Sequence, residues 1–188
     1  MGTHIHVYLD HNLPRFDDVN ETVERLNGVL PTALDVRDYW RLVDPSARRN
    51  EEVWKAEPID ARLADKRMFY GPGALGLWVM KSTAKIHTGG RWRGFLSIEP
   101  LRRVHLAAFR DIAQAMGSAK MALCADSQDE PWDVFRAGGS QDECIAALRT
   151  ALGPPQPSVD SIAPDVVAQV EHGVPSVWFL ETIPAAAK

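Results

Sequence analysis

Three histidines and an aspartate lie close together near the start of the chain, at His4, His6, Asp10 and His11. Residues two apart on a strand project from the same face, and imidazole with carboxylate suits zinc and similar ions. The metallo-hydrolase pattern H-x-H-x-D-H would need the aspartate and the last histidine two residues earlier, and no second ligand cluster is evident downstream. A metal site made of these four residues is therefore the alternative hypothesis.

The two cysteines are the next candidates for chemistry. Cys124 falls on an expected strand and Cys144 on the inner side of an expected helix, where cysteine packs as a small hydrophobe. No neighbour in the sequence would lower the pKa of either thiol. We expect buried, reduced thiols, and only the fold could bring His87, His105 or His172 beside one of them.

A glycine-rich stretch over 71–76 matches G-x-G-x-x-G. The dinucleotide motif requires a strand before the glycines and a helix after them, whose N-terminal amides bind the pyrophosphate. Here a charged segment precedes and a strand pattern follows, so we expect a loop that leads into a strand. Walker, G-x-S-x-G and S-x-x-K patterns are absent from the sequence, and we expect no cofactor.

Charge is distributed unevenly along the chain. Residues 81–103 hold six basic side chains against one acidic, and residues 120–171 hold nine acidic against three basic. A net charge of −4 and the absence of a longer basic stripe argue against nucleic-acid binding. The Arg- and Gly-rich stretch over 89–94 is therefore interpreted as a solvated hairpin turn.

An acidic stretch over 126–133 follows a predicted strand and surrounds one tryptophan. Charge of one sign steers the encounter with an oppositely charged partner, and a partly buried tryptophan can anchor it. This stretch is the candidate surface for a basic protein partner. Its residues are Asp126, Asp129, Glu130, Trp132 and Asp133.

Periodicity predicts the elements that position these residues. Alternation indicates strands, and apolar residues three and four apart indicate helices. Strands are expected over 4–9, 75–81, 85–87, 93–98, 119–125 and 176–182, and helices over 16–30, 35–44, 100–116, 140–152 and 159–170. The order strand 93–98, helix 100–116, strand 119–125 predicts a β-α-β unit with parallel strands. The last strand is apolar on both faces, which is typical of a central position.

We therefore expect an α+β fold with a mixed sheet of about five to six strands and helices packed against it. With 188 residues the chain is long enough for one core and short for two, so residues 1–188 are expected to form a single globular domain. The Pro-rich connector 154–157 is internal to it, because too few residues follow to fold alone. Residues 45–67 are expected to form a long surface excursion with a short helix near Trp54.

The cellular compartment is inferred from targeting and membrane features that are not found in the sequence. The N-terminal residues do not resemble a secretory leader, and no apolar run approaches the length of a membrane span. With only two cysteines, a disulfide framework is not expected. We expect a cytoplasmic protein without a membrane partner.

An acidic α+β domain with many tryptophans and no catalytic signature is similar in type to bacterial toxin-neutralising immunity proteins, although no shared motif carries the likeness. The first hypothesis is therefore a protein-binding module, rather than an enzyme, that neutralises or regulates a partner by occlusion. The partner would be a basic toxin domain bound by the acidic stretch over 126–133. The alternative is a small metal-dependent enzyme that uses the N-terminal His/Asp cluster.

Overall fold

A seven-stranded antiparallel sheet forms the centre of the protein, in the order β2-β3-β4-β5-β1-β6-β7. The computed structural model describes residues 3–44, 51–58, 65–160, 162, 166 and 177–184. The strands are β1 (His4–Leu9), β2 (Lys55–Ala56), β3 (Arg67–Gly71), β4 (Leu75–Val79), β5 (Ala84–Arg91), β6 (Lys120–Ala125) and β7 (Phe179–Thr182). The helices are α1 (Val19–Gly28), α2 (Leu30–Val43), α3 (Trp92–Ser97), α4 (Glu99–Met116), α5 (Asp129–Arg136) and α6 (Gln141–Leu152), with a 3-10 turn over Pro72–Ala74. The expected α+β class is confirmed.

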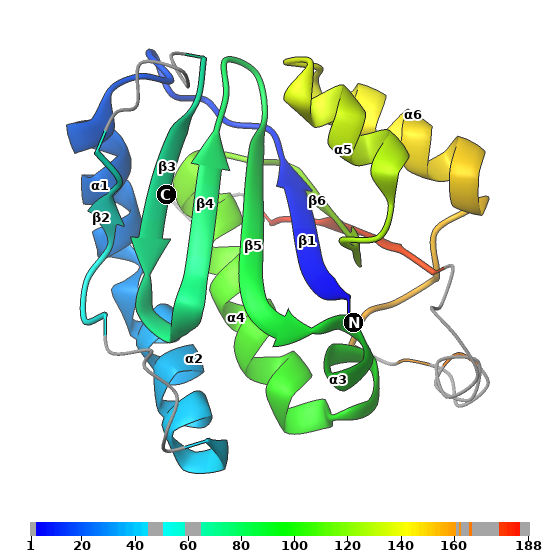
Figure 1. The fold of residues 1–188 in the computed structure, drawn as a ribbon, viewed down its shortest axis with the longest axis horizontal. Helices are drawn as coiled ribbons and strands as arrows, with labels where there is room; N and C mark the ends of the chain where they lie inside the picture. Colours follow the sequence, from blue (N-terminus) through cyan, green and yellow to red (C-terminus); the bar gives the residue numbers. More distant parts are fainter. Residues whose placement is uncertain are drawn as a thin grey trace.

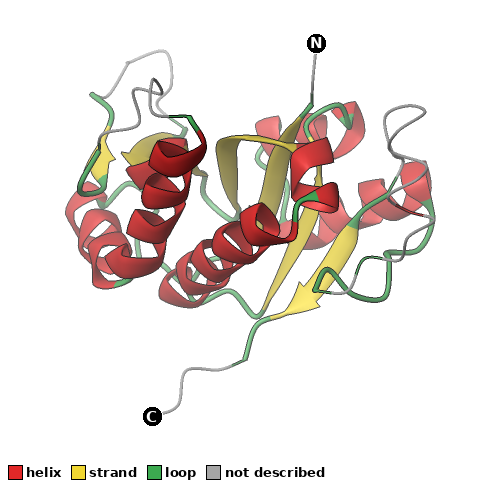
Figure 2. Cartoon of the chain, turned by 90° about the horizontal axis from the view of Figure 1, so that it is seen from below, coloured by secondary structure: helices red, strands yellow, loops and turns green. Residues whose placement is uncertain are grey.

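Helices cover the two faces of the sheet unequally (Figures 1 and 2). Helices α1 to α4 cover one face, where Ile5, Val7 and Leu9 of β1 join the larger apolar core. Helices α5 and α6 cover part of the other face and bury Tyr8 and Cys124. Over β3, β4 and β5 this second face carries no helix among the described residues (Figure 1). A strip of sheet is thus left for side chains that face away from the larger core.

The sheet is antiparallel throughout its named strands, so the expectations of a mixed sheet and of five to six strands were wrong. Strands β5 and β6 do run parallel and are joined through α3 and α4, but β1 lies between them and pairs with both. The connection is a split β-α-β unit rather than two adjacent parallel strands. Sequence order alone does not reveal that a distant strand is inserted.

Residues 93–97 belong to α3 instead of the expected strand 93–98, and no hairpin turn occurs at Gly89 and Gly90. Both glycines lie in β5, and a Cβ on Gly90 would come within 3.2 Å of the ring of His105. Glycine is present there because α4 approaches closely. Trp92 is fully buried and stacks on Phe95 at 5.5 Å, one helical turn away.

The charged segment 45–67 contains strand β2 and the start of β3, and the helix expected near Trp54 is absent from its described part, 51–58 and 65–67. Trp54 is buried, and a Cβ on Gly71 would lie 2.5 Å from its ring. One tryptophan thus fixes the segment against β3. Residues 45–50 and 59–64 lie outside the described residues, as does most of the helix expected over 159–170.

The last strand, β7, lies at the edge of the sheet and pairs with β6, so the central position expected for it was wrong. Its apolar character has another cause. Trp178 packs in the core under α5 and α6, and Phe179 packs in the core on the opposite face. The connector is tied to this strand, because Gln156 N–H donates to the Trp178 carbonyl at 2.8 Å.

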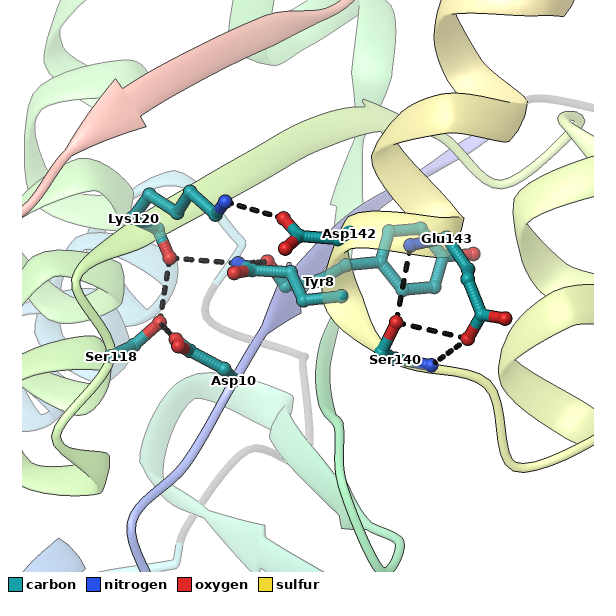
Figure 3. Close-up of polar contacts among 8 residues, drawn as sticks. Tyr8, Asp10, Ser118, Lys120, Ser140, Asp142 and Glu143 are labelled. Atoms are coloured by element: carbon teal, nitrogen blue, oxygen red, sulfur yellow. Dashed lines mark hydrogen bonds and ion pairs between the residues drawn. The ribbon is translucent and has the colours of Figure 1, made fainter.

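Helices α4 and α6 begin and end where the sequence signals indicate. Pro100 lies in the first turn of α4, and Gly117 closes it in the left-handed conformation at φ 76°. Ser140 and Glu143 form the expected capping box at the start of α6 (Figure 3). Gln141 then donates to the carbonyls of Tyr8 and Lys120, which fixes α6 on β1 and β6. No helix in the described part of the chain is long and apolar enough to cross a membrane.

Removing the Ser140 cap tests how far α6 depends on its first turn. Ser140→Ala leaves the Glu143 N–H without its side-chain acceptor, so we expect the free energy of unfolding to fall by about 1 kcal/mol in urea unfolding. Thr150→Ala is the matched control, because Thr150 is exposed on the same helix and bonds only to Ala146 within it. An equal loss in both variants would contradict the role of the cap.

Candidate functional site

A hollow of about 350 Å³ opens on the part of the sheet that no described helix covers. Strand register explains its lining, because His6 lies opposite His87, and Lys85 lies opposite Trp78 across β4 and β5. Side chains on one face of paired strands converge in this way. The lining residues are His4, His6, Trp78, Lys85, His87, Thr88, Gly89 and Asp126.

Lys85 is the central group of the hollow and is only 2% exposed. Its Nζ lies 3.9 Å from the ring centroid of Trp132 and 4.3 Å from that of Trp78. The hydrogen-bond partner of the amine is His6 Nε2 at 3.3 Å, and no carboxylate of the described residues forms an ion pair with it. Burial lowers the pKa of Lys85 to about 7, so near neutral pH a large fraction of the amine is uncharged.

The rings of His6 and His87 are neutral near pH 7. Burial, followed by repulsion from Lys85, lowers the pKa of His6 to about 2 and that of His87 to about 4. A protonated Lys85 has donors only, so His6 Nε2 accepts and its proton resides on Nδ1. That Nδ1 atom is buried without a hydrogen-bond partner among the described residues. His6 therefore contains a buried N–H that has no acceptor among the described residues.

The ring of His87 packs over Gly76 of β4. A Cβ on Gly76 would come within 2.1 Å of His87 Nε2, so the ring occupies the space that a side chain at position 76 would fill. The ring also meets Trp78 edge-on at 5.3 Å. Its buried Nε2 has no hydrogen-bond partner in the described part of the chain. Gly76 thus matters for ring packing in the hollow, not for phosphate binding.

His4 and Asp126 form a pair at the mouth of the hollow. His4 Nδ1 and Asp126 Oδ2 are 3.0 Å apart, with 39% and 28% of the side chains exposed. The backbone holds the pair, because Asp126 N–H donates to the His4 carbonyl. The carboxylate occupies Nδ1, which leaves Nε2 of His4 for a ligand or for proton transfer.

The structure divides the four candidate metal ligands between separate places. His4 and His6 line the hollow, whereas His11 Nε2 bonds to the Met80 carbonyl at 2.7 Å. Asp10 accepts a hydrogen bond from Ser118 (Figure 3). The four side chains do not form one ligand set, and nowhere in the described residues do three or more His, Cys, Asp or Glu gather as a metal would require.

The candidate partner surface is divided as well. Helix α5 begins at Asp129 and turns Trp132 toward the sheet, where it meets Trp78 at 5.3 Å. Asp126 belongs to the hollow. Asp129, Glu130 and Asp133 remain exposed on α5.

Both cysteines are buried and free, as the sequence indicated. Burial raises the pKa of both thiols, that of Cys144 to about 12. Neither is a nucleophile in this environment. Likewise, the glycine-rich stretch 71–76 leads through a 3-10 turn into β4, as expected.

Sequence reasoning missed Lys85, His87 and Trp78 as members of a site. A signal was present, since Lys85 and His87 alternate with buried Ile86 and therefore share a face. The alternation did not reveal that this face meets His6. Comparison with protein-family models and with curated proteins finds no match to this chain.

The low pKa values of His6 and His87 predict a stability loss on acidification. In the unfolded chain each histidine binds a proton near pH 6.5, whereas in the folded chain each stays neutral down to about pH 4 or below. Below pH 6.5 the unfolded state therefore binds more protons than the folded state. The free energy of unfolding decreases as the pH falls.

We expect the free energy of unfolding to drop by about 1 to 2 kcal/mol per histidine between pH 7 and pH 5. Urea unfolding at each pH measures this, and the double variant His6→Gln, His87→Gln should lose that part of the dependence. The interval from pH 7 to pH 5 lies above the pKa values that carboxylates ordinarily have. Asp and Glu therefore contribute little to this change in the free energy of unfolding. A pH dependence unchanged by the double variant would show that the rings are not buried neutral.

Proposed function

We propose that this protein binds a small anionic molecule in the hollow lined by His4, His6, Lys85 and His87, and acts on it or senses it there. The observation that carries the proposal is the buried Lys85 amine, which forms no ion pair with a carboxylate of the described residues and belongs to a hollow lined by three histidines. Asp126 also lines this hollow, but it pairs with His4. Buried charged groups are otherwise paired. A carboxylate or phosphate group would supply the missing counter-charge.

The donors of the hollow suit an anion. Lys85 provides an ammonium and His6 an N–H without an acceptor, and hydrogen bonds from charged donors to anions are among the strongest in proteins. An anion beside Lys85 would also raise the pKa of the amine and return it to the charged form. Binding is therefore coupled to proton uptake.

The walls suit an apolar or planar body. Trp78 lines the hollow together with the imidazoles of His6 and His87, and His87 packs edge-on against Trp78. Trp132 lies next to this wall, where its ring contacts Trp78 and the Lys85 amine. Aromatic walls with a few convergent polar groups are typical of metabolite sites, and the volume lies at the small end of their range. A compact molecule with one acidic group fits this lining.

Calorimetric titration with benzoate, acetate and inorganic phosphate tests the proposal. We expect benzoate to bind more tightly than acetate because of the aromatic walls, and Lys85→Met to weaken binding by about tenfold or more. Methionine keeps the length and apolar stem of the side chain. The control is Lys81→Met, which removes an exposed lysine of the loop before β5. Absence of binding by all three anions, or equal affinity in Lys85→Met, would contradict the proposal.

The second candidate function is the occlusion of a basic protein, of the toxin-immunity type. The observation in its favour is that Asp129, Glu130 and Asp133 are exposed on α5 and form no ion pair with the residues that the structure describes. Trp132 turns inward, so charge rather than an aromatic anchor would carry the encounter. A basic toxin domain remains the partner proposed for this surface.

Reversal of the α5 charges tests this second function. A pull-down from native extract with the wild-type chain should retain one stoichiometric basic protein. The variant Asp129→Lys, Asp133→Lys should then associate at least tenfold more slowly, because steering by charge is lost. The variant Glu24→Lys, Asp35→Lys is the control, since it reverses two exposed charges on α1 and α2. Equal association of both variants would remove α5 as the contact surface.

A further inference from the structure

We propose that Lys85 forms a Schiff base with the carbonyl group of a 2-oxo acid bound in the hollow. The inference rests on the proposed anion-binding function and names its substrate class. The geometry behind it is the position of one amine, which is buried against the rings of Trp78 and Trp132 and belongs to a residue that lines a hollow with three imidazoles.

Before the acid binds, burial of Lys85 favours the neutral amine, which is the nucleophilic form. A proton that the amine gains when the carboxylate binds must leave it again before the amine attacks. Lysines become nucleophiles where they are desolvated in an apolar pocket or lie near other cationic groups. The first condition holds, since Lys85 is 2% exposed and its amine contacts the rings of Trp78 and Trp132. Lys66 also lowers the pKa of Lys85, but its effect is smaller than that of burial and is opposed by Asp126. The pKa of about 7 agrees with this position.

His6 acts as a positioning residue. With the proton of His6 on Nδ1, a neutral Lys85 donates one of its N–H groups to His6 Nε2 across 3.3 Å. That bond restricts the rotation of the amine and therefore the direction of its lone pair. His4 lines the same hollow, and Asp126 orients its ring, so His4 is the residue placed to exchange a proton with the carbonyl oxygen.

The chemical step balances without an oxidant or a reductant. The Nζ lone pair forms a bond to the carbonyl carbon while the π pair moves to oxygen, which takes up a proton. The carbinolamine then loses its hydroxyl group and a proton as one molecule of water. A C=N bond replaces the C–O bond and the N–H bonds of the amine.

Two chemical requirements of the site indicate that the substrate is a 2-oxo acid. The carbonyl carbon must reach Lys85, and an acidic group nearby must meet the imidazoles that line the same hollow. In a 2-oxo acid the carboxylate is bonded directly to the carbonyl carbon. A single small molecule therefore meets both groups within a compact hollow.

Trapping with pyruvate and cyanoborohydride at pH 7 tests the inference, because cyanoborohydride reduces an imine to a stable secondary amine. Mass spectrometry of the intact chain and of its peptides counts and locates the adduct. We expect Lys85 to be modified at least tenfold faster than exposed Lys81, and no fast adduct in Lys85→Met. The location in the wild-type chain does not depend on how any variant folds.

The outcomes separate the inference from the proposed function. Selective modification of Lys85 that benzoate suppresses would support both. Slow modification spread over the exposed lysines, with Lys85 unmodified, would overturn the Schiff base, and the calorimetric binding of benzoate would then show that the anion site stands without it. If benzoate, acetate and phosphate all fail to bind as well, both proposals are wrong.

Discussion

The site depends on the burial of β1 on both of its faces. Ile5, Val7 and Leu9 can enter the larger core only in one register, and that register forces His4, His6 and Tyr8 onto the opposite face. A shift of one residue would exchange the two sets. The apolar residues of β1 therefore position the histidines, although they do not line the hollow themselves.

The burial of the Lys85 amine is energetically unfavourable. An ammonium taken out of water is unfavourable, and contact with the faces of Trp78 and Trp132 offsets only part of that loss. A methionine would fill the same space at lower cost. A buried amine that lines an open hollow is thus better explained by a ligand than by stability.

Local periodicity predicted much of the fold. Strand β1, helix α4 and the capped helix α6 followed from residues that recur at periods of two and of three to four. Residues 93–98 were misassigned because Trp92 and Phe95 are apolar in either conformation, and helical stacking decides between them. Strand β2 is too short to produce a pattern, and its segment is fixed by the contact of Trp54 with Gly71.

The site was predicted only in pieces. His4, His6 and Asp126 were singled out, but for two different surfaces and with unrelated partners. Their convergence with Lys85 depends on which strands are neighbours, and the insertion of β1 between β5 and β6 is a long-range fact that no local pattern encodes.

The same insertion sets an order of events during synthesis. Strand β1 leaves the ribosome before either of its neighbours, so it has no strand to pair with until β5 has emerged, and its second edge stays open until β6 follows. Pairing over such a separation closes long loops, which slows folding. Since Asp126 comes directly after β6, the lining of the hollow is incomplete until β6 has been made, and its completion coincides with closure of the central strands.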